Sequence, residues 1–453
     1  MKTSNKSKLT TGKISTLLVK LTIPMIAGMM GMVIFNLVDT FFIGQLGKDQ
    51  LAAMGFTFPI VMIVTSISVG LGMGTSAVIS REIGKGSSAL VKHLATNSLL
   101  LGFPVIAVFA VVGIFTIEPL FSLMGAEGIV LEYIKEYMQI WYIGVPFVVI
   151  PMIGNNIIRA TGDMKTPGMI MVAIATLNAV LDPLLIFGLG PFPEMGIAGG
   201  ALATLFSRAV GMTLAFIILI KREKIINFAV PKIKELLDSW KRILYIGVPA
   251  ALAKLIIPLS LGIITRLVAE YGNSAVAGFG VASRLEALAM MLLFALSTVL
   301  IPFTGQNMGA GLKDRVLKAV KLSYIFSLIW GAFMFVLFLI TGKFFAGLFN
   351  KDPEIIATVV LYLNVVSISY GFQGFMIISS AVLNGSHKPI HSAILSISRM
   401  FVFYIPLALL GAKYFDLKGI FLAGCIANFA TGLLSLYFVH RQIKLKPINL
   451  VTK

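Results

Sequence analysis

The chain has 453 residues, of which 58% are hydrophobic and only 12% are charged, and its formal net charge is +18. Its mean hydropathy of +0.95 exceeds what a soluble core needs, so the composition excludes an ordinary soluble protein and favours a bundle of membrane-spanning helices. The positive charge does not indicate nucleic-acid binding, because the basic residues gather in the loops between apolar stretches.

Long, weakly charged stretches recur about a dozen times, and each is close to the roughly 20 residues that a helix needs to cross a bilayer. They predict an all-α polytopic membrane protein with twelve transmembrane helices. The predicted spans are 15–43, 52–79, 94–117, 133–157, 168–190, 196–220, 243–269, 278–304, 319–341, 355–383, 391–412 and 418–439. We expect an N-lobe of six helices over 1–220, a charged cytoplasmic linker over 221–242, and a C-lobe of six helices over 243–453.

The basic residues are distributed unequally between the two sets of loops. On the side that carries both termini and the linker there are 26 Lys and Arg residues, whereas the other side has six. Loops rich in Lys and Arg remain in the cytoplasm. The sequence therefore predicts a multi-pass protein of the plasma (inner) membrane with both termini in the cytoplasm.

The second half of the chain is a diverged copy of the first half and runs in the same direction. An offset of 225 takes Pro24 to Pro249, and further on an offset of 223 takes Gly162 to Gly385. Parallel repeats of this kind are typical of transporters whose substrate path lies between the halves. Pro24 lies near the inner third of the first span, where it is a candidate hinge; a static kink is the alternative.

Two aspartates lie inside the predicted spans of the first half only. Under the same offsets Asp39 maps to Ile264, and Asp182 maps to Ile405. An aspartate near the middle of a span costs about 2.5–3.5 kcal/mol on insertion scales, so such residues usually have a function. The alternative is that one of them caps a broken helix or bonds a backbone amide. A duplicated scaffold with acids in one half suggests a transporter with a one-sided ion site.

Two further polar residues are expected at the depth of the aspartates. Asn178 precedes Asp182 by four residues and therefore shares its helix face. Thr204 lies about eight residues into the sixth span, which returns from the outside to roughly the same level. Together with Asp39 these residues predict an oxygen-rich cluster that binds a proton or a small hard cation.

Other ionisable residues fall inside predicted spans, and the sequence does not decide between structural ties and transport groups for them. They are Arg208, Lys254, Arg266, Arg284, Glu286 and Arg399. Of these, we expect Lys254 to pair with Glu286. His387 and His391 are four residues apart, but Pro389 between them disfavours a metal site. Because no nucleophile–base pair or zinc signature is present, we predict neither an enzyme nor a bound metal or cofactor.

Several short motifs resemble those of the MATE (multidrug and toxic compound extrusion) family. The first-span motif is VDTFFIG at residues 38–44, with LG at 46–47 and LAAMG at 51–55. RATGD at 159–163 resembles the family's loop after span four, and LDP at 181–183 resembles its fifth span. The run from Gly196 to Thr204 is similar to the sixth span. The resemblance covers nearly the whole chain, including the parallel six-plus-six repeat.

The resemblance implies a secondary active multidrug antiporter that exports lipophilic, often cationic, compounds in exchange for H⁺ or Na⁺ by alternating access. In the prokaryotic DinF-like branch, the matching residues would couple the ion (Asp39, Asn178, Asp182, Thr204), line the substrate cavity (Asn155, Phe35) and form the hinge (Pro24). The NorM-like branch has an acid in span seven, where residues 249–258 contain Lys254 and no acid. That departure favours the DinF-like branch and disfavours a cation site in the C-lobe.

The sequence leaves two alternative functions open. A lipid-linked oligosaccharide or peptidoglycan-precursor flippase of the same superfamily would line its cavity with several cations for pyrophosphate. A polytopic membrane transferase would need catalytic His or Asp residues near an interface and usually some soluble chain, and the sequence has little of either. As partners we expect small-molecule substrates, the coupling ion and membrane lipids, with no nucleic acid, and we expect a monomer.

Overall fold

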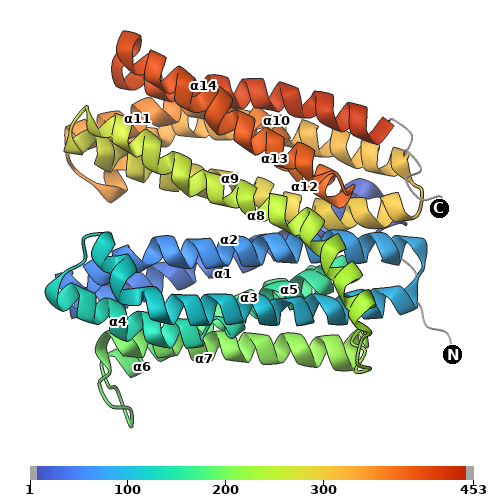
Figure 1. The fold of residues 1–453 in the computed structure, drawn as a ribbon. Helices are drawn as coiled ribbons and strands as arrows, with labels where there is room; N and C mark the ends of the chain where they lie inside the picture. Colours follow the sequence, from blue (N-terminus) through green and yellow to red (C-terminus); the bar gives the residue numbers. More distant parts are fainter. Residues whose placement is uncertain (1–7, 445–453) are drawn as a thin grey trace. The chain divides into compact units, whose positions relative to one another are not determined.

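The computed structural model describes residues 8–444, and the regular secondary structure within that range is helical (Figure 1). Contacts divide the described chain into two compact units. Unit 1 comprises Lys8 and residues 20–251, and unit 2 comprises residues 9–19 and 252–444.

Unit 1 is built from helices that run up and down between short connections. Its elements are most of α1 (Ile14–Leu46), α2 (Lys48–Lys85), α3 (Ser88–Leu123), α4 (Gly128–Ile143), α5 (Pro146–Ala160), α6 (Lys165–Ile186), α7 (Gly196–Ile217), the π-helical turn η1 (Ile218–Arg222) and the first half of α8 (Ile233–Ala269). The predicted fourth span is a bent pair, because α4 and α5 meet at an angle of 43°. Pro146 starts α5 there, and its missing N–H ends the hydrogen-bond ladder of α4.

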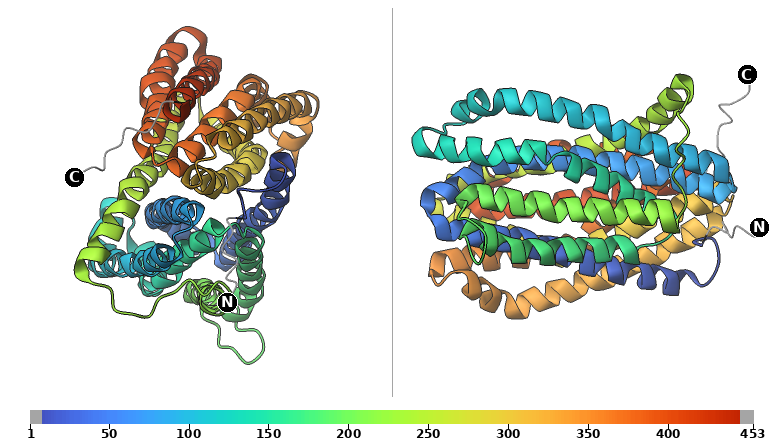
Figure 2. Two further views of the ribbon diagram at one scale, coloured as in Figure 1. Left: turned by 90° about the vertical axis from the view of Figure 1, so that its right-hand side faces the viewer. Right: turned by 90° about the horizontal axis from the view of Figure 1, so that it is seen from below.

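Unit 2 repeats this up-and-down arrangement with more irregular helices (Figure 2). Its elements are the second half of α8, α9 (Asn273–Gly309), α10 (Lys313–Phe349), α11 (Pro353–Val366), the 3₁₀ turn η2 (Ser367–Ser369), α12 (Tyr370–Gly385), α13 (Pro389–Ile397), the π-helical η3 (Ser398–Tyr404) and α14 (Ile405–Lys444). The predicted tenth span is therefore interrupted by η2, and the predicted eleventh span is wound partly as a π-helix.

The element α14 contains a chain reversal. Phe415 and Asp416 have non-helical backbone angles, and Asp416 has a positive φ of 51°. A Cβ on Gly411 would lie 2.4 Å from the carbonyl oxygen of Gly419, a proximity that a continuous helix does not allow over eight residues. Ten helices are long and apolar enough to cross a membrane, and the bent pair α4–α5 makes eleven. The reversal divides one of the ten, so residues 8–444 contain the twelve predicted spans.

Glycines bring the helices of unit 1 into close contact. A Cβ on Gly70 would lie 2.6 Å from the carbonyl oxygen of Gly247 in the first half of α8. A Cβ on Gly168 in α6 would lie 2.4 Å from the carbonyl oxygen of Pro24 in α1. Small residues let helix backbones approach in lipid, so the first contact brings α2 close to α8 and the second brings α1 close to α6. The α1 helix continues through Pro24 without a break.

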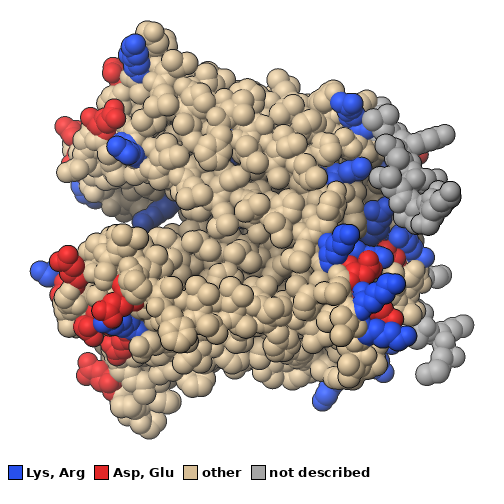
Figure 3. All heavy atoms as spheres, in the orientation of Figure 1, with Lys and Arg blue, Asp and Glu red and all other residues tan. Residues whose placement is uncertain are grey.

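Charged side chains gather at the two ends of the helices in each unit and leave the band between them largely uncharged (Figure 3). In unit 1, one end carries Lys85, Lys92 and Lys165, whereas the connections at the other end carry acids such as Glu118 and Glu127. An apolar band between charged ends matches a bilayer, in which the backbone polar groups must be satisfied inside helices. The chain is a multi-pass membrane protein.

Candidate functional site

Three helices of unit 1 contribute pairs of residues spaced by four, so both members of each pair lie on one face. The pairs are Phe35 and Asp39 on α1, Asn178 and Asp182 on α6, and Thr204 and Arg208 on α7. Figure 1 shows α6 and α7 next to each other in the lower part of the view. The Gly168–Pro24 contact fixes α1 against α6, so the three pairs share one part of unit 1.

The polar members of these pairs are buried. Asp39 is 6% exposed, Thr204 is 5% exposed, and Asn178 and Asp182 are fully buried. Asn178 donates a hydrogen bond from Nδ2 to Oδ1 of Asp182 over 2.9 Å. Within residues 8–444, the other carboxylate oxygen of Asp182 has no hydrogen-bond partner, and neither do Oδ1 of Asp39, Oδ1 of Asn178 and Oγ1 of Thr204. Four buried oxygens without partners are the kind of donor set that a proton or a small cation completes.

Arg208 and Tyr137 complete the charge arrangement of this cluster. The guanidinium of Arg208 lies 5.5 Å from the centre of the Phe35 ring, within the range of a cation–π contact. It attracts the carboxylate of Asp39, and Asp39 in turn repels that of Asp182. Tyr137 on α4 is buried and interacts electrostatically with both aspartates. The cluster therefore holds two acids against one cation in a part of the helices that excludes water.

The structure brings the four predicted oxygen-bearing residues into one unit and places two of them in direct contact. Neither aspartate caps a helix or accepts a hydrogen bond from a backbone amide among the described contacts, so the alternative of a structural cap is wrong. Arg208 had no role assigned from the sequence. Its spacing of four residues from Thr204 was the signal that would have placed it in the same cluster.

The predicted cavity asparagine lies on a different helix from the cluster. Asn155 is on α5 and is buried, and its Oδ1 accepts no hydrogen bond from the part of the chain that the structure describes. The described contacts include no hydrogen bond between Asn155 and the acids. Phe35, in contrast, belongs to the cluster through its contact with Arg208. The roles of Asn155, Phe35 and Pro24 in transport remain predictions.

Unit 2 holds a different set of ionisable residues. The carboxylate of Glu286 accepts a hydrogen bond from Gln373 Nε2 over 2.8 Å and another from the Tyr362 hydroxyl. Lys254 instead lies over the ring of Phe294, with Nζ 5.4 Å from its centre. The expected pairing of Lys254 with Glu286 is therefore wrong, because Tyr362 on α11 and Gln373 on α12 bond the carboxylate instead.

Three cations of unit 2 lie within predicted spans, far from the charged ends of unit 2, and have no acidic partner within ion-pair distance among the described residues. They are Lys254, Arg284 and Arg399. Arg399 donates from Nε to Oδ1 of Asn428 over 2.8 Å. The only acid at comparable depth among the described residues of this unit is Glu286. The interior of unit 2 thus carries an excess of positive charge.

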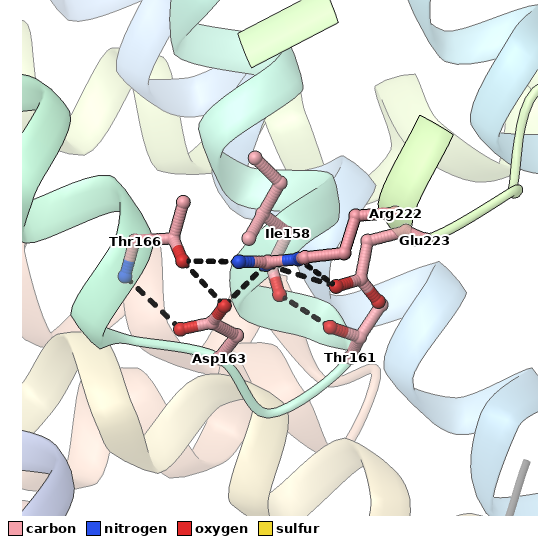
Figure 4. Close-up of polar contacts among 6 residues, drawn as sticks. All are labelled: Ile158, Thr161, Asp163, Thr166, Arg222 and Glu223. Carbon is pink, nitrogen blue, oxygen red and sulfur yellow. Dashed lines mark hydrogen bonds and ion pairs between the residues drawn. The ribbon is translucent and has the colours of Figure 1, made fainter. Parts of the chain in front are cut away.

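A separate polar network connects the turn between α5 and α6 to the end of the π-helical turn η1 (Figure 4). Asp163 accepts hydrogen bonds from the backbone N–H of Thr166 over 3.0 Å and from its hydroxyl over 2.6 Å. Arg222 bonds the same carboxylate and also reaches Glu223 over 2.9 Å. Partial burial alone would raise the pKa of Asp163, but the bonds from Thr166 and the charge of Arg222 outweigh it and hold the pKa below its usual range.

The described residues contain no group of three or more His, Cys, Asp or Glu side chains that could hold a metal ion.

A protein-family model matches both halves of this chain. The MatE family model matches residues 24–184 and 249–410, which together exceed half of the chain. The two matches begin 225 residues apart (249 − 24), as the repeat predicts.

Similar proteins cover nearly the whole chain. The FAD transporter of Shewanella oneidensis is 39% identical over 428 residues, 94% of this chain and 95% of the relative. The probable multidrug resistance protein NorM of Thermotoga maritima is 27% identical over 410 residues, 88% of this chain and 86% of the relative. A solved mutant of the MATE transporter VcmN of Vibrio cholerae has a TM-score of 0.91 at 30% identity, covering 95% of this chain and 97% of that one. The chain belongs to the MatE family and is a secondary transporter of small molecules, not an enzyme.

Proposed function

We propose that this chain exports flavin adenine dinucleotide (FAD), or a nucleotide of the same chemical class, in exchange for H⁺ or Na⁺. The observation that carries the proposal is the 39% identity to the FAD transporter of Shewanella oneidensis over 94% of the chain. The sequence resemblance led to an expectation of lipophilic cations as substrates, and the proposal replaces that substrate class with an anionic one.

The charges of unit 2 support an anionic substrate. FAD carries a diphosphate, and moving such a group through a membrane without compensating cations costs a large desolvation energy. Lys254 is unpaired among the described residues, and a partnerless cation within a span is by default a candidate for function. Its neighbour Phe294 offers an aromatic face of the kind on which a flat ring such as the flavin stacks.

The cluster of unit 1 supplies the ion coupling in this proposal. A proton or sodium ion would bind among the partnerless oxygens of Asp39, Asn178, Asp182 and Thr204. Binding would neutralise the repulsion between the two carboxylates, and loss of the ion would restore it. A bound ion therefore changes the energy of packing α1 against α6 and α7. We also propose that the chain belongs to the DinF-like branch and that both termini lie in the cytoplasm. The acids in unit 1 and the absence of an acid from residues 249–258 support the branch, and the excess of Lys and Arg in one set of loops supports the orientation.

The test is efflux from proteoliposomes that contain FAD and are placed in an inward proton gradient or, separately, an inward sodium gradient. FAD release into the medium is followed by fluorescence, with wild type beside Asp39→Asn. We expect release in one of the two gradients and none in the variant. Equal release by both proteins would overturn the role of the cluster.

A second candidate is multidrug export, which is favoured by the relatives described as multidrug resistance and multidrug export proteins. The same liposomes loaded with ethidium distinguish it. Gradient-driven release of ethidium without release of FAD would replace the nucleotide with lipophilic cations as the substrate. Release of neither would favour the export of a lipid-linked precursor.

A further inference from the structure

A pocket of about 480 Å³ opens at one end of unit 1, away from the acid cluster. It is lined by the end of α2, the first turn of α3, the α5–α6 turn and the chain that follows η1. Six of its lining residues are charged, namely Lys8, Lys92, Asp163, Arg222, Glu223 and Lys224. Neither ion coupling nor substrate transport as proposed above uses these residues.

The two acids of the pocket are already occupied by protein groups. Figure 4 shows Asp163 and Glu223 converging on the guanidinium of Arg222. Asp163 also accepts both hydrogen bonds from Thr166, so its oxygens face the α5–α6 turn. These carboxylates hold Arg222 in place and have little capacity left to attract a cation.

The three lysines of the pocket have no such partners. Lys8, Lys92 and Lys224 form no ion pair with the described residues. Lys224 has a positive φ of 52°, which L-residues rarely adopt, so its backbone is held in a costly conformation beside the pocket. Four cations against two acids leave the pocket with a net charge of +2.

The first turn of α3 adds to this positive field. Ser88 and Val91 line the pocket, and the N-cap residue Ser87 gives no side-chain hydrogen bond to the helix. The N–H groups of Ser88 and Val91 already donate to the carbonyl oxygens of Gly86 and Ser87, so this turn contributes the positive end of the helix dipole rather than free donors. The lysines and this turn together surround a space that suits a compact, multiply charged anion.

We propose that this pocket binds a phosphate-bearing anion through Lys92 and Lys224, with Arg222 fixed behind them. Two sources have the required chemistry: the headgroup of an anionic phospholipid, and a soluble phosphate or diphosphate. Basic pockets between helices at the cytoplasmic surface bind lipid phosphates. This end of unit 1 is rich in basic residues, as such a surface is. The site is separate from the transported substrate and does not depend on its identity.

The experiment uses the full-length protein purified in detergent, with two probes. Native mass spectrometry counts the phosphatidylglycerol molecules retained from a mixture with phosphatidylcholine. Calorimetry measures the binding of inorganic pyrophosphate. The variants are Lys92→Gln, Lys224→Gln and the double variant, and Lys221→Gln is the matched control, because Lys221 is exposed on η1 but does not line the pocket. Gel filtration and the melting temperature confirm that each variant is folded.

We expect wild type to bind at least one probe, and each single variant to bind it roughly tenfold more weakly, the loss expected from one charge-assisted hydrogen bond, with a larger loss in the double variant. Lys221→Gln should bind as wild type does. Loss in the lipid arm alone assigns a headgroup, and loss in the pyrophosphate arm assigns a soluble phosphate. Failure of wild type to bind either probe, or equal weakening by Lys221→Gln, would overturn the proposal.

Discussion

Unit 1 and unit 2 come from one duplicated scaffold, yet their interiors carry opposite charges. Unit 1 buries Asp39 and Asp182, whereas the matching positions of unit 2 are Ile264, which is fully buried in its apolar core, and Ile405, which packs against that core. Conversely, the unpaired Lys254 of unit 2 maps back to Met29 in unit 1. The two units have kept the same order of helices, but their buried charged residues differ. A carrier needs such a difference if one half binds a cation and the other binds an anion.

Asp39→Asn should have the largest effect among the variants that test this contrast. Glu286→Gln is its counterpart in unit 2. Because Asp39 has a buried oxygen without a partner, its replacement should abolish gradient-driven release of FAD to the level of protein-free liposomes. Glu286 is already bonded to Tyr362 and Gln373, so Glu286→Gln should keep that release. If Glu286→Gln also abolishes coupling, both units handle the ion and the contrast fails.

Lys254→Gln tests the other half of the contrast. Removing one charge-assisted contact to a phosphate should raise the KM for FAD roughly tenfold, while ethidium transport is unchanged or increased. Transport kinetics in proteoliposomes measure both substrates. Lys343→Gln on α10 is the matched control, because that lysine is exposed near the end of its helix. An unchanged KM for FAD in Lys254→Gln would remove the argument for an anionic substrate from unit 2.

Gly168→Ala tests whether the two units differ in helix packing. Gly168 lies directly against the backbone of α1, whereas the matching residue of unit 2 is His391, which bonds Gln442. A methyl group at Gly168 would lie 2.4 Å from the Pro24 carbonyl oxygen. Overpacking of this kind typically costs about 1–3 kcal/mol, so the melting temperature should fall. Gly55→Ala has open space around the new methyl group and should be neutral. Equal melting temperatures for the two variants would show that α1 is held in another way.

Asp163→Asn has the smallest expected effect, and the matching residue in unit 2 is Ser386. Loss of the bonds to Arg222 and Thr166 should cost about 1 kcal/mol after discounting for solvent screening. The folded-state pKa of Asp163 is lowered, so its stabilisation is complete above the unfolded pKa and is lost as pH falls through the folded value. Melting curves should therefore separate the two proteins by a constant amount between pH 8 and 5 and converge only below roughly pH 4. If the difference in melting temperature between wild type and Asp163→Asn varied near neutral pH, a titratable group other than Asp163 would be responsible for it.

Much of the fold follows from hydropathy alone, because each span must be long and apolar and each connection short. The twelve spans and the repeat were predictable in this way, and so was the buried acid pair with Asn178. The bend at Pro146 and the π-helical turn at Ser398–Tyr404 were not, because hydropathy is blind to local changes in helix winding. The sequence also did not predict that Lys254 contacts Phe294 and that Glu286 bonds Tyr362. These contacts depend on how the helices pack, and hydropathy does not report which helix faces meet.

The spacing of four residues within each pair of the acid cluster has a mechanical consequence. Successive residues of an α-helix are turned by about 100° around its axis, so two residues four apart differ by only about 40°. A rotation of α1 by one residue's turn would carry Phe35 and Asp39 away from α6 and α7 together. The same holds for Asn178 with Asp182 and for Thr204 with Arg208. In the proposed mechanism, the cluster is assembled or taken apart by whole helix faces, so its affinity for the ion would depend on the rotation of each helix about its axis.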